Sequence, residues 1–324
     1  MRMFALVLGL AATLLSGSPS TARQVAPGQT DPQDLPPTQL EEVVVTGSPA
    51  AEAATAFVRS VAAPAPDREL ALWRDPVCVG VGGMQADAAQ FMVDRISDWA
   101  HSLGLRIGRP GCRPNIFIVA TDDGDATARD LVASRPREFR TGVAGADRGG
   151  AALRAFQSSG RPVRWWHVSL PVDEETGNPI RRLPGQPPVE WTGRRLERRS
   201  DFGVNAMAVS PSRLSSRVRD DLQQVIVVVD TAALETATFV QVTDHVAMAA
   251  LAQLEPDANP ASPSILNLFR PEGSVEETLT RWDLAFLRGL YSAEQNRSGT
   301  GANLSAVAAA MAREIEASAE DLVP

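Results

Sequence analysis

A strand–helix–strand pattern next to two cysteines constrains the fold of this chain more than any other feature. Residues 76–81 and 115–121 are short apolar runs typical of strands, and residues 87–103 carry apolar side chains at helical spacing. In a βαβ unit the two strands are parallel, so neighbouring strands would bring Cys78 and Cys112, near their N-terminal ends, within bonding reach. We therefore expect a structural Cys78–Cys112 disulfide; the alternative is a reactive thiol pair, although the spacing is not Cys-x-x-Cys.

The rest of the chain mixes further helical and strand-like segments, which indicates an α+β fold with a mixed sheet. We expect a single domain over residues 51–292, with the βαβ part at 70–160, and a C-terminal helix or tail at 293–324. A loop rich in proline and arginine is expected at 171–199. The expected helices cover 51–62, 125–135, 150–158, 212–222 and 304–317, and the expected strands cover 164–170, 204–209 and 225–230.

The first 50 residues are typical of a targeting segment and a linker. Residues 1–22 combine Arg2, an apolar core and small residues ending at Ala22, as a cleavable secretory signal peptide does. A membrane anchor is the alternative, but the apolar core of about 13 residues falls short of the roughly 20 that span a bilayer. Residues 23–50 are rich in polar residues and proline, which predicts a disordered leader. We expect an exported protein, periplasmic or secreted.

Composition excludes several classes of function. A net charge of −8 argues against a nucleic-acid partner, which normally needs a basic surface. All 31 cationic side chains are arginine, so chemistry that needs a P-loop lysine, a Schiff-base lysine or a Ser–Lys dyad is excluded. The glycine-rich residues 80–84 lack the third glycine of a dinucleotide-binding motif, so we expect a tight turn there and no cofactor. Asp122, Asp123 and Asp125 are expected to cap a helix; a hard-cation site is the alternative.

The C-terminal part carries three features in a defined order: a helix-like run at 243–254, the tetrapeptide Ser264–Asn267, and a helix start at Thr280 with Asp283 as the third residue of a capping box. With the apolar strand that precedes them, they resemble the end of a zincin-type metallopeptidase domain, in which a zinc-binding helix, a tight turn and a closing helix follow one another. The resemblance covers residues 200–292. It extends to a family of secreted and lipid-anchored proteobacterial proteins whose helices are similarly degenerate.

A true zincin helix carries His-Glu-x-x-His, in which both histidines bind zinc and the glutamate activates water. If Asp244 takes the first ligand position, His245 replaces the glutamate and Met248 replaces the second histidine. If His245 takes the second ligand position, Gln241 and Val242 fill the first two. Neither alignment supplies the ligands and the base, so we expect no catalytic residues and no bound metal. The resemblance then implies a non-catalytic binding domain; the alternative is a metal-dependent hydrolase with an atypical ligand set, such as His245 with Asp244.

Two consecutive tryptophans, Trp165 and Trp166, lie in a predicted strand, so one indole ring should lie on each face of the sheet. We expect both rings to pack in the core, which requires helices on both faces of the sheet. The alternative is one exposed ring beside the arginine-rich residues 181–199, as a platform for a sugar, a peptide or an anionic polymer.

The predicted leader contains a valine-rich segment at residues 40–48, with Val43, Val44 and Val45 in succession. Such a segment is suited to adding a strand to the sheet edge of another protein. It resembles the TonB box of outer-membrane transporters, which implies a TonB-type envelope partner and a role as an accessory protein. The alternatives are a linker that is β-prone by chance and an edge strand of the domain itself.

Overall fold

The computed structural model describes residues 49–64, 68–140, 146–175, 177–179, 218–234, 236–270, 276–295 and 299–320. The predicted signal peptide, nearly all of the leader including Val43–Val45, most of the loop at 171–199 and the strand at 204–209 lie outside these residues. The prediction of a loop is wrong for residues 171–173, which continue strand β4 (Val163–Asp173) and pair with residues 218–220.

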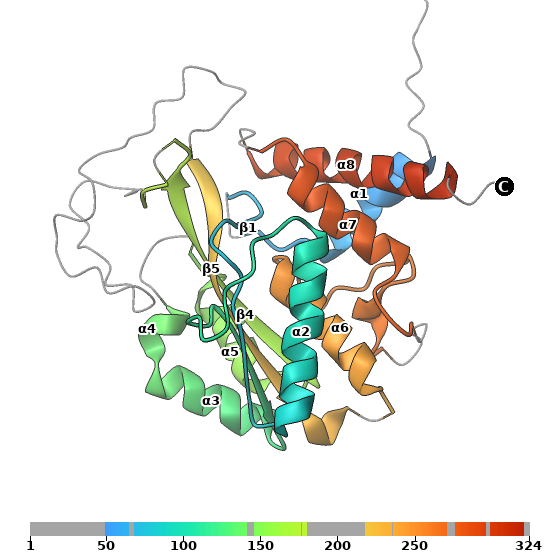
Figure 1. Cartoon of the computed structure of the whole chain (residues 1–324). Coiled ribbons are helices and arrows are strands. Elements are labelled where there is room, and N and C mark those ends of the chain that lie inside the picture. The colour runs from blue at the N-terminus through green and yellow to red at the C-terminus, as the bar shows by residue number, and fades with distance from the viewer. Residues whose placement is uncertain are drawn as a thin grey trace, which may run out of the picture. The chain divides into compact units, whose positions relative to one another are not determined.

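One mixed sheet forms the centre of the described domain (Figure 1). Strand β3 lies between β2 and β5, and all three are parallel. The long strand β5 also pairs in parallel with the short β1, and in an antiparallel manner with β4 along most of its length. The strands are β1 (Leu72–Trp73), β2 (Val79–Gly82), β3 (Ile116–Thr121), β4 (Val163–Asp173) and β5 (Val218–Asp230).

Helices cover both faces of this sheet (Figure 1). One face packs against α2 and α6 in a large apolar cluster that also includes α1, α7 and α8. The other face packs against α3, α4 and α5 in a smaller cluster. The helices are α1 (Pro49–Val61), α2 (Ala86–Ser102), α3 (Gly124–Ser134), α4 (Pro136–Phe139), α5 (Gly149–Ser158), α6 (Phe239–Leu251), α7 (Arg281–Ser292) and α8 (Thr300–Glu320), with short 3-10 helices η1 (Thr231–Ala233) and η2 (Ile265–Asn267).

The predicted βαβ unit and its disulfide are confirmed. Helix α2 connects β2 to β3, and these strands pair in parallel with Val79 opposite Ile116. Cys78, just before β2, is bonded to Cys112, just before β3, with a Cα–Cα distance of 6.2 Å. The bond closes a loop across 34 positions. In the chain-entropy model a loop of that length stabilises the fold by about 3–4 kcal/mol.

The tight turn expected at residues 80–84 is confined to Gly83 and Met84, because residues 80–82 belong to β2. Gly83 has a positive φ of 78°, and a Cβ there would lie 2.1 Å from the carbonyl oxygen of Ala120. The turn therefore requires glycine because backbone of the neighbouring strand approaches it closely.

The predicted helix at 212–222 is wrong in its last five residues, because β5 already begins at Val218. Residues 218–222 pair with the far end of β4, where Leu170 lies opposite Asp221. The two aspartates of this segment are buried, and each has an arginine partner: Asp220 pairs with Arg68 and Asp221 with Arg219. Tertiary pairing with β4 thus outweighs the local sequence preference for a helix.

Candidate functional site

Helix α6 is the central element of the region that the sequence analysis compared with a zincin. It follows β5 as expected, and Thr238 caps it in a capping box with Gln241. Every residue from Gln241 to Leu251 is buried, because α6 lies between the sheet and the C-terminal helices. Polar side chains on such a helix must find partners inside the protein. Those partners decide what the site can do.

The carboxylate of Asp244 is fully occupied by protein partners. Arg95, on α2, donates from Nε to Oδ1 at 2.6 Å and from Nη2 to Oδ2 at 2.7 Å. The indole Nε1 of Trp99 donates to Oδ1 at 2.8 Å, and the hydroxyl of Thr278 donates to Oδ2 at 2.7 Å. Asp244 has no exposed surface, and its hydrogen bond to Arg95 raises the pKa of that guanidinium. Asp244 therefore fastens α6 to α2 and has no lone pair directed toward a ligand.

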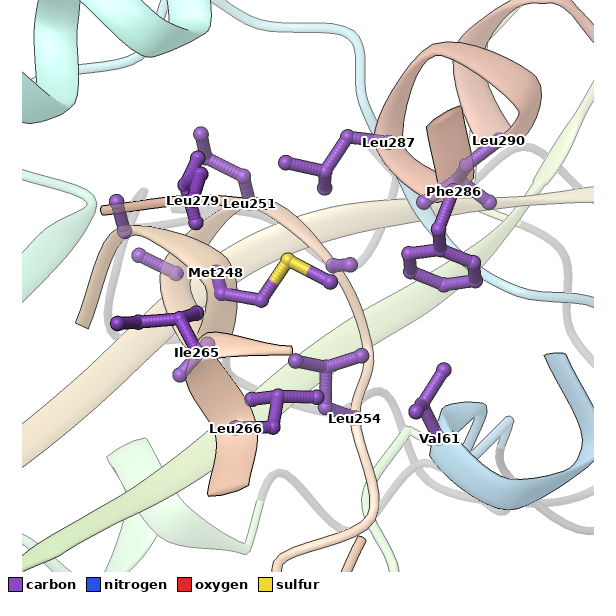
Figure 2. Packing of buried hydrophobic residues seen from close by; sticks show 14 of the residues in the cluster. Val61, Met248, Leu251, Leu254, Ile265, Leu266, Leu279, Phe286, Leu287 and Leu290 are labelled. Carbon is purple, nitrogen blue, oxygen red and sulfur yellow. The ribbon is translucent and has the colours of Figure 1, made fainter. Parts of the chain in front are cut away.

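Gln241 and Met248, at other positions of the two zincin alignments, also have their side chains engaged within the protein. The side-chain amide of Gln241 donates to the carbonyl of Glu276 and accepts from the backbone N–H of Thr238, both at 2.8 Å. Met248 is fully buried. Figure 2 shows it within a cluster of apolar side chains from η2, α7 and the end of α6. A metal ion could not reach these positions without disrupting the core.

His245, next to Asp244 on α6, borders a pocket. Its Nδ1 lies 3.0 Å from the carbonyl oxygen of Ile265, so Nδ1 donates and Nε2 is left as an acceptor. The ring lies between Trp165, at a centroid distance of 5.8 Å, and Phe269, at 5.1 Å in an edge-to-face arrangement. Burial lowers the pKa of His245 to about 4, so the imidazole is neutral at pH 7.

The turn that holds His245 is anchored to α7. Asp283 accepts from the Ser264 hydroxyl, from the backbone N–H of Ile265 at 2.9 Å, and from the backbone N–H of Thr280 at 2.9 Å. Thr280 and Asp283 form the predicted capping box. Burial raises the pKa of Asp283 in spite of these bonds. The anchored turn places the Ile265 carbonyl and thereby sets the orientation of the His245 ring.

A pocket of about 250 Å³ opens beside His245. Its walls come from the entry and start of β4, from α6 and the segment after it, and from η2 and the residues that follow. The lining residues are Arg161, Pro162, Val163, Trp165, His245, Pro256, Asp257, Ala258, Leu266, Phe269 and Arg270. A second pocket of about 110 Å³ shares Arg161, Trp165, Pro256 and Asp257 with the first. Arg161 and Asp257 form an ion pair, so the two pockets have this pair in common.

The structure places the two tryptophans in the core, on opposite faces of the sheet, as expected. Trp165 is 5% exposed and donates to the carbonyl of Leu254; Trp166 is 3% exposed and donates to the carbonyl of Phe139. The alternative of an exposed ring platform is therefore wrong for both. Trp165 instead contributes its ring to the pocket wall beside His245.

Sequence reasoning missed Phe269 and Arg270, which close the pocket opposite Trp165. They directly follow the Ser264–Asn267 turn, so their position next to a recognised motif was the available signal. The structure separates Asp244 and His245, which the alternative ligand set combined, because these adjacent residues have different partners. Asp244 is directed toward α2 and His245 toward the pocket.

Of the carboxylates expected to cap a helix, Asp123 does so, whereas Asp125 forms an ion pair. Asp123 accepts from the backbone N–H of Ala126 at the start of α3, and Asp125 pairs with Arg164. Within the described ranges, no cluster of three or more His, Cys, Asp or Glu side chains is arranged to hold a metal ion. Among the helices described, none has the length and apolar character needed to cross a bilayer.

The comparisons with known proteins add no relative. No family model, curated protein or solved structure matches this chain significantly.

Proposed function

We propose that this chain is an exported, non-catalytic binding domain of the cell envelope, in which a zincin-like C-terminal part serves as a scaffold for a ligand pocket. Support for the scaffold comes from the order of β5, α6, η2 and α7, which follows the order that the resemblance implies. Support for binding comes from the pocket at His245, which combines aromatic walls with polar groups. Concave, mostly apolar pockets with few polar groups are typical of small-molecule sites.

One observation carries the non-catalytic part of the proposal. Asp244, at the first ligand position of one alignment, is 0% exposed and holds Arg95, Trp99 and Thr278 in place of a metal. A zinc site needs three or four nitrogen, sulfur or oxygen ligands that converge on one point. The residues present do not fit zinc. Among the described positions of the two alignments, only His245 keeps a free lone pair, on Nε2, and a single ligand cannot hold the ion.

Metal analysis of the purified protein tests this proposal. We expect well under one zinc per chain in protein exported with its disulfide formed and purified without a histidine tag or chelators. We also expect His245→Ala and His101→Ala to have equally low metal content, His101 being an exposed control on α2. About one zinc per chain that disappears in His245→Ala, but not in His101→Ala, would instead establish the metal-dependent hydrolase with an atypical ligand set.

A second proposal concerns the valine-rich segment at 40–48, which lies outside the described residues. We propose that Val43, Val44 and Val45 bind a TonB-type envelope protein by strand addition, since three β-branched residues favour an extended backbone. A Val44→Pro variant should bind the purified C-terminal domain of TonB at least about tenfold more weakly, because proline removes a donor from the ladder. Equal binding of Val44→Pro and wild type, measured by calorimetry, would contradict this role.

A further inference from the structure

We infer that the pocket beside His245 takes a small organic acid that carries one carboxylate, one hydroxyl or N–H donor, and one aromatic or branched apolar group. The inference rests on the proposed binding function and adds the chemical class of the ligand. It depends on three properties of the pocket wall: an arginine without an acidic partner, a neutral imidazole nitrogen, and aromatic side chains.

The charge of the pocket favours an anion. Its titratable lining residues are Arg161, Arg270, Asp257 and His245. Arg161 is neutralised by its ion pair with Asp257. Arg270 donates only to the backbone carbonyls of Asp257, at 2.6 Å, and Ala258, at 2.8 Å, and pairs with no carboxylate among the described residues. Both bonds come from Nη2, so the other guanidinium donors remain for a carboxylate, the group that arginine binds best in a bidentate manner.

The imidazole of His245 favours a hydrogen-bond donor on the ligand. Its Nδ1 donates to the Ile265 carbonyl, which assigns the proton to that nitrogen and leaves Nε2 with a lone pair. No protein donor bonds to Nε2 in the described part of the chain, while the ring itself borders the pocket. A hydroxyl or N–H of the ligand would satisfy this acceptor.

The remaining walls favour an apolar body. The rings of Trp165 and Phe269 lie on either side of His245, and Leu266 and Val163 add aliphatic surface. Aromatic walls gain most from a flat or branched apolar group. The pocket volume of about 250 Å³ is below the ~300–1,000 Å³ typical of drug-sized ligands, so the ligand is small.

The test uses 3-phenyllactate, which has all three groups, and three analogues that each lack one. Binding is measured by titration calorimetry on the mature, disulfide-bonded protein. The analogues are 3-phenyllactamide without the charge, 3-phenylpropionate without the hydroxyl, and lactate without the ring. We expect phenyllactate to bind at least about tenfold more tightly than each analogue, the factor that a charge-assisted hydrogen bond gives.

Variants assign the contacts. Arg270→Gln should weaken phenyllactate binding at least about tenfold, and Arg270→Lys less, because it keeps the charge. Arg129→Gln, an exposed arginine of α3, should leave binding unchanged. His245→Asn, which places an amide donor near the Ile265 carbonyl, should weaken the binding of phenyllactate but not that of phenylpropionate.

Equal binding of phenyllactate and phenyllactamide, or no binding of phenyllactate to folded wild type, overturns the ligand class. A metal-free protein with no such binding would leave the non-catalytic proposal standing, so the two failures can be distinguished.

Discussion

Acidification from pH 7 to pH 4 is expected to lower the free energy of unfolding by about 6 kcal/mol through His167 and His245 alone. Burial lowers the pKa of each imidazole from 6.5 to about 4, and the Arg148 guanidinium adds to the effect at His167. Both are neutral in the fold, with Nε2 of His167 donating to the Ala249 carbonyl at 2.7 Å. In the unfolded chain both histidines take up protons near pH 6.5. In the folded protein both stay neutral until the pH falls to about 4. This contribution is therefore present above pH 6.5 and is lost as the pH falls toward 4, at about 3 kcal/mol per histidine.

Urea unfolding at pH 7 and pH 4 measures this loss. His167→Gln and His245→Asn keep a donor near the Nε2 and Nδ1 positions, and each should reduce the acid-induced loss by about 3 kcal/mol. His101→Gln, in an exposed position, should leave it unchanged.

Two other groups also respond to acid but remain the same in every variant. Burial raises the pKa of Asp283, so protonation of that carboxyl stabilises the fold at low pH. The Arg164 guanidinium lowers the pKa of Asp125, so the contribution of this ion pair to the free energy of unfolding is lost at low pH. The difference between wild type and each histidine variant therefore isolates the imidazole. If both variants lost as much stability as wild type, the assignment of buried neutral histidines would be wrong.

Removal of either partner of the Arg95–Asp244 pair is expected to cost about 3–5 kcal/mol. Asp244→Ala leaves Arg95 without its carboxylate, and Arg95→Met leaves a fully buried carboxylate with only Trp99 and Thr278 as donors. Arg95→Met should be the more damaging change, because the Asp244 side chain is 0% exposed whereas Arg95 keeps 28% of its side chain in solvent. Uncompensated buried charge is among the most costly defects in a protein core.

The double variant Arg95→Met/Asp244→Leu provides the matched control. Replacing both charges by apolar side chains of similar volume removes the unpaired charge, so stability should recover to within about 2 kcal/mol of wild type. Urea unfolding of wild type, Arg95→Met, Asp244→Leu and the double variant gives the coupling energy. Single-variant losses below about 1 kcal/mol, the size found for surface pairs, would show that this bond does not fasten α6 to α2.

Features that depend on neighbouring residues could be predicted from the sequence. The apolar spacing of residues 87–103 predicted α2 within one residue at each end, and the Thr280–Asp283 pattern predicted the cap of α7. The disulfide followed from the βαβ geometry. The zincin-like resemblance and the export signal stay predictions, and residues 40–48 lie outside the described part.

Contacts between distant segments could not be predicted. The helix expected at 212–222 overlaps β5 because residues 218–222 pair with β4. The start of α6 at Phe239 instead of Thr243 is a different case, because its signal, the Thr238–Gln241 capping box, is local and was overlooked. The candidate residues Asp244 and His245 were identified from one short motif, yet their roles differ because their partners come from elsewhere in the chain. Arg95 lies 149 positions from Asp244, and the pocket at His245 is completed by Trp165 and Arg270.

The sequence by itself determined the alternation of helices and strands, the caps, the cysteine pair and the absence of a His-Glu-x-x-His helix, because each is encoded by residue type at short spacing. Only the tertiary structure decided that Asp244 is a structural partner of α2, that both tryptophans are buried, and that a neutral His245 faces a pocket with an arginine. Side-chain direction, burial and electrostatic environment arise when segments pack, and no local pattern carries that information.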